Sequence, residues 1–222
     1  MKALAARWAN GGWSSSVGVK ALAAVSGLLS AGWCTLHVLG NAAAFSGPAA
    51  LDAYAAWLRT GASVPLWGLR CVLLVLLGAH VTLGLRLWWR ARAARPTRYR
   101  VSSASATPLV SRGLRWGGVA LGAFVVFHVL HINYGWLLPH FVRGQVYENL
   151  LAAFASPVVV AVYLLGSALV ALHLAHGLSA AAASLGWWAP SATGRRLALA
   201  FGSAIGLGFA AAPLAMALGV LR

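Results

Sequence analysis

The chain has 222 residues, of which 61% are hydrophobic and only 9% are charged, and its formal net charge is +15. Soluble domains carry about 25% charged residues, so this composition excludes an ordinary soluble protein and predicts an integral membrane protein. The basic excess does not indicate nucleic-acid binding, because most of the charge belongs to segments between apolar stretches rather than to a folded soluble face.

Five apolar stretches are long enough to cross about 30 Å of hydrocarbon as helices of roughly 20 residues. In chain order they cover about 19–41, 64–89, 113–134, 157–185 and 196–220. We therefore expect an all-α integral membrane protein, with one membrane domain over 1–222 that forms a five-transmembrane-helix bundle.

The first stretch follows a positively charged start, which also fits a cleaved signal peptide. It is longer than the usual core of about 7–15 residues, and it contains His37 and Asn41, which a discarded segment has no reason to carry. A lipoprotein-type cysteine is disfavoured, because Trp33 rather than a small residue precedes Cys34. Cys34 and Cys71 stand alone, without zinc or disulfide spacing, so any iron–sulfur cluster must belong to a partner.

The basic residues are distributed unevenly between the two sides of the predicted bundle. With the N-terminus in the cytoplasm, the inner side holds thirteen of the seventeen and the outer side holds four together with both acidic residues of the chain. The positive-inside rule then predicts a cytoplasmic N-terminus and an external C-terminus. The inner set is Lys2, Arg7, Lys20, Arg86, Arg90, Arg92, Arg95, Arg98, Arg100, Arg112, Arg115, Arg195 and Arg196, and the outer set is Arg59, Arg70, Arg143, Arg222, Asp52 and Glu148.

Both outer connections contain apolar residues at helical spacing. Leu51, Tyr54, Trp57 and Leu58 form one such set, and Val146, Leu150 and Phe154 form the other. We expect two short helices that lie at the outer interface of the lipid bilayer. The inner segment 92–111 is rich in Arg, Ser, Thr and Pro and is predicted to be a linker.

Each of the first four apolar stretches contains one histidine at a matched position, about sixteen to eighteen residues from its start. These are His37, His80, His128 and His173. An ionisable residue inside a membrane is a functional-site hypothesis by default. Because successive spans run in opposite directions, His37 and His128 are predicted near the outer face, and His80 and His173 nearer the cytoplasm.

Two histidines at one depth can clamp one haem iron between two imidazoles, which suits electron transfer because no coordination position remains for a substrate. Bundle cores hold cofactors on inward-facing side chains of this kind. Two spans offer a second candidate three residues later, His131 after His128 and His176 after His173, and spacing alone does not choose between them. Small residues near these positions would let a macrocycle approach the backbone, although they also favour helix packing: Gly40, Gly78, Gly84, Gly122 and Gly177.

At these residues the chain resembles the di-haem cytochrome b membrane anchor of succinate:menaquinone oxidoreductases and fumarate reductases, in which one five-helix subunit carries both haems. The similarity rests on short motifs over about 20–190. They are His37-x-x-x-Asn41, His80-x-x-x-Gly84, Phe127-His128-x-x-His131 and, most specific, His173-x-x-His176-Gly177-Leu178-Ser179, which is followed by Gly186-Trp187.

The resemblance implies that His80 and His173 hold a haem b proximal to the cytoplasm and that His37 and His128 hold a distal one. It implies a flavoprotein subunit and an iron–sulfur subunit as partners on the cytoplasmic side, in the inner membrane of a bacterium. The chain would then be the quinone-reactive, metal-binding subunit of a succinate dehydrogenase of the tricarboxylic acid cycle. It would transport electrons to menaquinone or another quinone and perform no succinate chemistry itself.

One departure from the family concerns proton transfer. Some members carry a glutamate two residues before the fourth ligand, where this chain has Ala171. A glutamate-dependent proton pathway is therefore not expected.

Several polar and aromatic residues are candidates for the quinone site. By resemblance we favour a site at the outer haem, with Tyr54, Trp57 and Glu148 as possible quinone contacts. Asn41 and His131 on the outer side and His176 on the inner side are possible surroundings of a haem or quinone. Further outer candidates are Asn133, Tyr134 and His140, and inner candidates are Ser26, Lys20, Arg86, Trp88 and Trp89. An aromatic belt at the membrane interface explains many of these aromatic residues equally well.

Two alternative functions stay open. The chain can be the haem b subunit of another quinone-linked complex, such as a formate dehydrogenase or nitrate reductase. From a different class, it can be a transporter that uses histidines for protons or metal ions. Transporters of that kind usually place carboxylates within the spans, and here both acids fall in the outer connections.

Overall fold

The computed structural model describes residues 15–94, 108–187 and 191–222, with the side chains of 108–115 left aside. All the regular structure in this part of the chain is helical. It comprises α2 (Ser16–Asn41), α3 (Pro48–Thr60), α4 (Ser63–Ala93), α5 (Pro108–His128), α6 (Val146–Phe154), α7 (Pro157–Ser184) and α8 (Ala192–Ala217), with a 3-10 turn at Ala42–Ser46 and a π-helical turn at Val129–Asn133.

Five helices are long and apolar enough to cross a membrane, and this confirms the predicted five-span, all-helical fold. They are α2, α4, α5 with the π-helical turn that follows it, α7 and α8, and their bounds lie within a few residues of the predicted stretches. The main difference is in the predicted 92–111 linker. Helix α4 continues to Ala93 and α5 begins at Pro108, so helix covers both ends of that segment.

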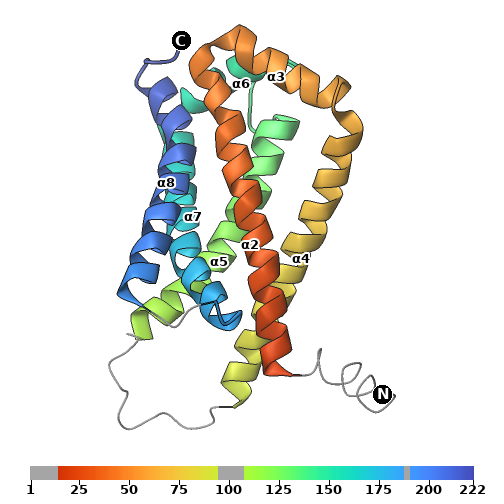
Figure 1. Cartoon of the computed structure of the whole chain (residues 1–222). Coiled ribbons are helices and arrows are strands. Elements are labelled where there is room, and N and C mark those ends of the chain that lie inside the picture. Colours follow the sequence, from red (N-terminus) through yellow and green to blue (C-terminus); the bar gives the residue numbers. More distant parts are fainter. Residues whose placement is uncertain (1–14, 95–107, 188–190) are drawn as a thin grey trace.

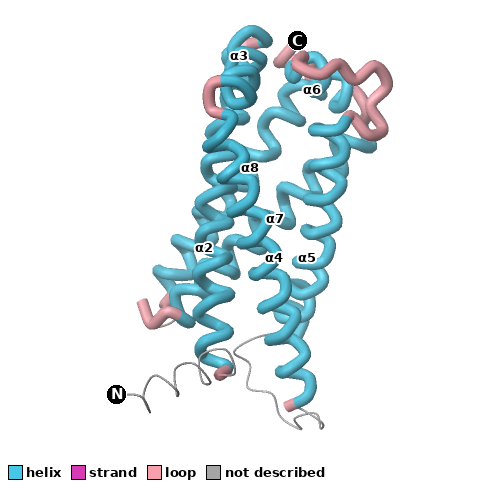
Figure 2. The backbone as a smooth tube through the Cα atoms, turned by 90° about the vertical axis from the view of Figure 1, so that its right-hand side faces the viewer, coloured by secondary structure: helices cyan, strands magenta, loops and turns pink. Residues whose placement is uncertain are grey.

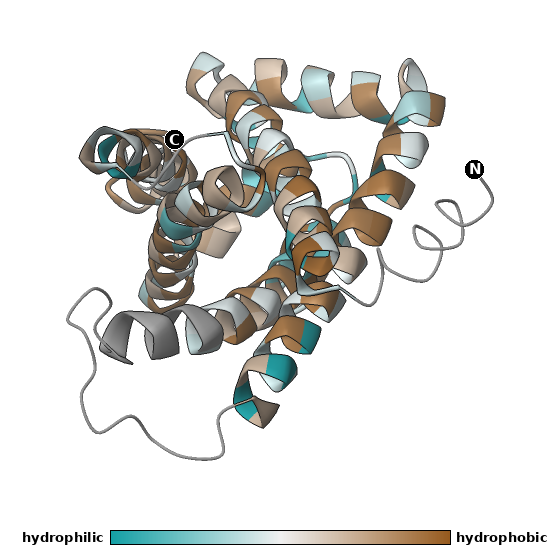
Figure 3. Ribbon diagram, turned by 60° about the horizontal axis from the view of Figure 1, so that its bottom comes forward, coloured by the Kyte–Doolittle hydropathy of each residue, from teal (hydrophilic) through white to brown (hydrophobic). Residues whose placement is uncertain are grey.

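The five long helices run roughly along one axis, and their directions alternate in chain order (Figure 1). Helices α3 and α6 lie at one end of the bundle, which we call the capped end (Figure 2). At the other end, which we call the basic end, α4 finishes with Arg90 and Arg92 and α8 begins before Arg195 and Arg196. The last turns of α4 form a hydrophilic tip on an otherwise largely apolar bundle (Figure 3).

The charge distribution follows these two ends where the residues are described. Asp52, Arg59, Glu148 and Arg222 belong to the capped end, and both acids lie in short helices outside the spans. Of the predicted inner set, Lys2, Arg7, Arg95, Arg98 and Arg100 fall outside the described residues, as do the side chains of Arg112 and Arg115. The assignment of the basic end to the cytoplasm stays a prediction.

Helices α7 and α8 form the closest pair in the bundle. A Cβ atom at Gly202 would lie 2.8 Å from the Ala175 nitrogen, and one at Gly206 would lie 2.9 Å from the Ser167 carbonyl oxygen. These glycines therefore let the two backbones touch, as small residues commonly do between membrane helices. Helix α2 packs against α4, α7 and α8, and α5 packs mainly against α7.

The predicted short helices in the connections at the capped end are present as α3 and α6, and a carboxylate joins them. Asp52 Oδ1 on α3 accepts hydrogen bonds from the Val146 and Tyr147 backbone nitrogens at 2.7 and 3.0 Å. These are two of the unpaired N–H groups that begin α6. The Asn149 side chain bonds both the N–H and the carbonyl of Val142, which ties the preceding loop to the same helix. Asp52 is thus a helix cap supplied from another element.

We expect Asp52→Ala to lower the free energy of unfolding by about 1–2 kcal/mol, the usual cost of losing a helix cap. The measurement is the thermal unfolding midpoint of the purified chain in detergent. Glu148→Gln is the matched control, because Glu148 is exposed on α6, the helix that Asp52 caps, and its replacement should change stability by less than about 0.5 kcal/mol. Equal midpoints for Asp52→Ala and the unchanged chain would contradict the capping role.

Candidate functional site

The histidines of α2 and α5 face each other near the capped end. The ring centres of His37 and His128 are 5.9 Å apart and their planes meet at 70°. Aromatic rings surround them: Phe209 of α8 lies 5.6 Å from His37, and Tyr163 of α7 lies 5.8 Å from His128. We call His37 and His128 the capped-end pair.

The histidines of α4 and α7 face each other in a closely similar way. The ring centres of His80 and His173 are 6.0 Å apart, with an interplanar angle of 78°. Like the capped-end pair, these two side chains are half-buried. Because they lie nearer the other end of the bundle, we call them the basic-end pair.

Helix contacts give the spacing between the two pairs along the bundle. A Cβ atom at Gly27 would touch the His80 ring, so His80 lies level with Gly27, which is ten residues before His37 on α2. A Cβ atom at Gly118 would likewise lie 3.9 Å from His173, and Gly118 is ten residues before His128 on α5. At 1.5 Å per residue, both helices place the pairs about 15 Å apart.

The geometry of each pair fits two imidazoles on opposite sides of one metal ion. A metal–imidazole bond is about 2 Å long and the coordinating nitrogen lies about 1 Å from its ring centre, so the ring centres of such a pair are roughly 6 Å apart. Both measured separations match this value. No group of three or more His, Cys, Asp or Glu side chains that could hold a metal ion occurs among the described residues. A haem needs only two, because its macrocycle supplies the other ligands.

The helices that carry each pair are not close packing partners. Within the described structure α2 packs against α4, α7 and α8, whereas its contact with α5 is at most marginal, and the same holds for α4 with α7. Each pair of rings therefore meets between two helices that other helices hold apart. Such a spacing is what a flat group between two ligands requires.

The five glycines near the histidines were predicted either to let a macrocycle approach the backbone or to favour helix packing, and they differ in their surroundings. A Cβ atom at Gly78, Gly84, Gly122 or Gly177 would meet no other atom within 4 Å, so no helix contact explains these positions. At Gly40, in contrast, a Cβ would lie 2.9 Å from the Tyr54 hydroxyl oxygen. Gly40 therefore makes room for Tyr54 of α3.

His131 lies apart from the capped-end pair, because helix α5 changes to a π-helical turn directly after His128. The wider turn alters the direction of the residues that follow it, and π-turns are frequent at functional sites. His131 is only 1% exposed, and its Nδ1 shares a 3.0 Å hydrogen bond with the Tyr163 hydroxyl. Its Nε2 is buried without a partner in the described structure. His131 is thus placed beside Tyr163 rather than opposite His37.

The other predicted residues divide into those near a pair and those away from both. Tyr54 places its hydroxyl against α2 at Gly40, one turn after His37. Asn41 ends α2 and is half-buried, whereas Trp57, Glu148, His140 and His176 are exposed. Ser26 is buried beside His80, and Lys20 and Trp89 are exposed. The structure therefore brings Tyr54 and Asn41 toward the capped-end pair and Ser26 toward the basic-end pair.

Three contributors were not predicted from the sequence. Tyr163 is the hydrogen-bond partner of His131, Gly27 makes room for His80, and Phe209 covers His37. Tyr163 carries a usable signal, since it is a polar aromatic residue within the apolar α7 segment. Gly27 and Phe209 carry none, because glycine and phenylalanine are ordinary residues in membrane helices.

Comparison with known proteins gives no further identification. No protein-family model, curated protein or solved structure matches the chain. The function must therefore be argued from the site itself.

We expect Tyr163→Phe to lower the free energy of unfolding by about 1–2 kcal/mol, because it leaves both nitrogens of a buried imidazole without a partner. The double variant His131→Leu/Tyr163→Phe should be less destabilised than the single one, since it removes both polar partners. Thermal unfolding midpoints in detergent measure both effects. Additive losses in the double variant would contradict the pairing.

Proposed function

We propose that this chain is a di-haem electron-transfer subunit in which His37 and His128 hold one haem b and His80 and His173 hold the other. The observation that carries the proposal is the pair of facing histidines at two levels, with ring centres 5.9 and 6.0 Å apart. A single histidine between membrane helices can serve as a hydrogen-bonding residue and does not by itself indicate a ligand. Two facing pairs with the separation that one metal ion requires indicate ligands.

The residues of each pair have a defined chemical task. The two imidazoles of each pair would hold one haem iron and leave no coordination position for water or substrate, which favours electron transfer. When bound, each haem supplies a one-electron Fe(III)/Fe(II) carrier. The surrounding aromatic side chains, among them Phe209 and Tyr163, keep the capped-end pair in an apolar environment.

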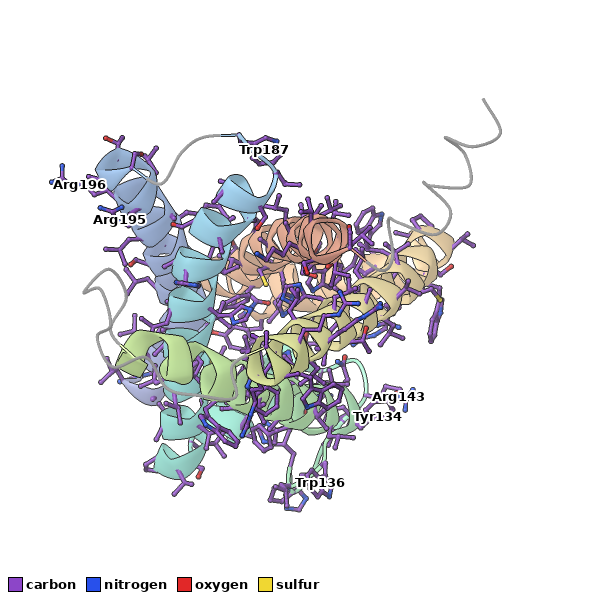
Figure 4. The ribbon with its side chains drawn as sticks, turned by 90° about the horizontal axis from the view of Figure 1, so that it is seen from below. Tyr134, Trp136, Arg143, Trp187, Arg195 and Arg196 are labelled. Carbon is purple, nitrogen blue, oxygen red and sulfur yellow. The ribbon has the colours of Figure 1, made fainter. Side chains whose placement is uncertain are left out.

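The proposed complex is a succinate:quinone oxidoreductase, and the chain is its membrane anchor. We place the basic end in the cytoplasm, as the positive-inside rule favours, and the flavoprotein and iron–sulfur subunits against that end. Arg195 and Arg196 there extend outward from the start of α8 (Figure 4). With Arg90 and Arg92 they give this end the positive charge that an acidic partner surface would meet.

We place the quinone near the capped-end pair. This location is supported by the Tyr54 hydroxyl, which lies against Gly40 one turn from His37, and by the polar His131–Tyr163 pair next to His128. Trp57 stacks at 6.3 Å on Tyr54, so both rings of α3 belong to the same surface. Glu148 is an exposed carboxyl group on α6 at this end.

The first experiment is a reduced-minus-oxidised optical spectrum of the purified chain, with haem quantified per polypeptide. We expect two low-spin haems b per chain, because each iron would be held by two imidazoles. In membranes that contain the whole complex, succinate should reduce both haems and formate should not. A folded chain without haem would overturn the proposal, and reduction by formate alone would assign the chain to a different respiratory complex.

Alanine substitution of either histidine of a pair should remove the same single haem. His37→Ala or His128→Ala should abolish the capped-end haem only, and His80→Ala or His173→Ala should abolish the basic-end haem only, because each iron loses one of two protein ligands. Haem per chain and separate redox titrations measure the outcome. His140→Ala and His176→Ala are controls that should keep two haems, since both side chains are exposed, unlike those of the four paired histidines. Two haems retained in any of the four ligand variants would disprove the pairing.

A further inference from the structure

His80 differs from the other paired histidines in its hydrogen bonds. Its Nδ1 lies 3.1 Å from the Ala23 carbonyl oxygen and 3.4 Å from the Ser26 hydroxyl oxygen, and both partners belong to α2. For His37, His128 and His173 the described residues provide no hydrogen bond to a ring nitrogen. Helix α2 therefore contacts the imidazole of α4 through polar groups as well as by packing.

These contacts determine which ring nitrogen carries the proton. A backbone carbonyl only accepts hydrogen bonds, so the His80 Nδ1 within its reach must be an N–H. The Ser26 hydroxyl donates to the same Ala23 carbonyl at 3.1 Å, which leaves its oxygen free to accept from Nδ1–H as well. In neutral imidazole the other nitrogen, Nε2, then has the lone pair that a metal needs.

Gly27 fixes the position of the same ring by its lack of a side chain. A Cβ atom there would lie 2.9 Å from His80 Cε1 and 3.2 Å from Nδ1. The Nδ1–Cε1 edge of the imidazole therefore lies directly on the α2 backbone. Ser26 is 5% exposed, so water does not compete for this contact.

We infer that Ala23, Ser26 and Gly27 of α2 are positioning residues that hold His80 as the Nδ1–H tautomer with Nε2 available to the basic-end haem. This inference rests on the proposed function and adds a specific asymmetry to it. Within the described structure, only the basic-end pair has a ring nitrogen hydrogen-bonded to a neighbouring helix. Partners of this kind orient metal-bound histidines, raise their basicity and contribute about 10–100-fold to metal affinity.

The test compares two glycine-to-alanine variants of α2 in the full chain. Gly27→Ala should displace the His80 ring and weaken haem binding at the basic-end pair by about 10–100-fold, with the capped-end haem unchanged. Gly32→Ala is the matched control, because a Cβ there meets no atom within 4 Å. Haem per chain during titration of the haem-free chain measures affinity, and a redox titration measures each midpoint potential.

A serine series keeps the inference testable if Gly27→Ala fails to fold. Ser26→Ala removes one acceptor of the Nδ1–H bond, so the imidazole becomes a weaker donor to iron and the basic-end potential should rise. Ser26→Thr retains the hydroxyl and should restore the original potential. If Ser26 serves only in helix packing, the basic-end potential should be unchanged in both Ser26→Ala and Ser26→Thr.

The outcomes separate this inference from the proposed function. A folded wild-type chain that binds no haem overturns both. Two haems in the wild type, with the same haem affinities in Gly27→Ala as in Gly32→Ala and the same basic-end potential in Ser26→Ala as in Ser26→Thr, overturn the inference alone. Loss of the capped-end haem instead of the basic-end haem in Gly27→Ala would also overturn the inference, because it would show that Gly27 acts on His37 rather than on His80.

Discussion

The arrangement of the bundle depends on the need of each buried imidazole for a partner in a medium without water. A buried polar group without a hydrogen-bond partner costs from about one to several kcal/mol in an apolar interior. Each buried histidine nitrogen is therefore more stable with a hydrogen-bond or metal partner. His131 uses the Tyr163 hydroxyl for its Nδ1, while its Nε2 has no partner in the described structure. His80 uses the Ala23 carbonyl and Ser26 for one of its two nitrogens. In the proposed function, each pair of facing histidines would bind the iron of one haem.

Close helix packing occurs between α7 and α8 but not between the two helices of a histidine pair. Glycines allow contact where backbones must touch, as Gly202 and Gly206 of α8 do against α7. Helix α8 carries no histidine and contributes Phe209 beside His37, so it acts as a support for the helices that do. The helices that bear facing histidines are held by third helices and contact each other little. In the proposed function this leaves room for a haem between the two helices of each pair.

The sequence predicts the five spans and the level of each histidine, because both depend on apolar length and on 1.5 Å per residue. It leaves His128 and His131 equivalent, since the π-helical turn that separates them has no sequence pattern of its own. Asp52 looks like a residue of an amphipathic helix, and its role at the start of α6 depends on a contact between segments 94 positions apart. The roles of Tyr163 and Gly27 likewise depend on contacts with other helices, and sequence periodicity does not predict such contacts.

The surroundings of the two pairs suggest different tasks within the proposed function. The basic-end pair has one ligand fixed by backbone and serine, which suits a carrier that only passes electrons. The capped-end pair lies close to Tyr54 and the His131–Tyr163 pair, which can hydrogen-bond a quinone. Both carboxylates of the chain lie at that end, outside the spans, and Ala171 stands where some anchors of the resembled family carry a glutamate. Protons for a quinone bound there would therefore enter from the capped end, while electrons arrive from the basic end.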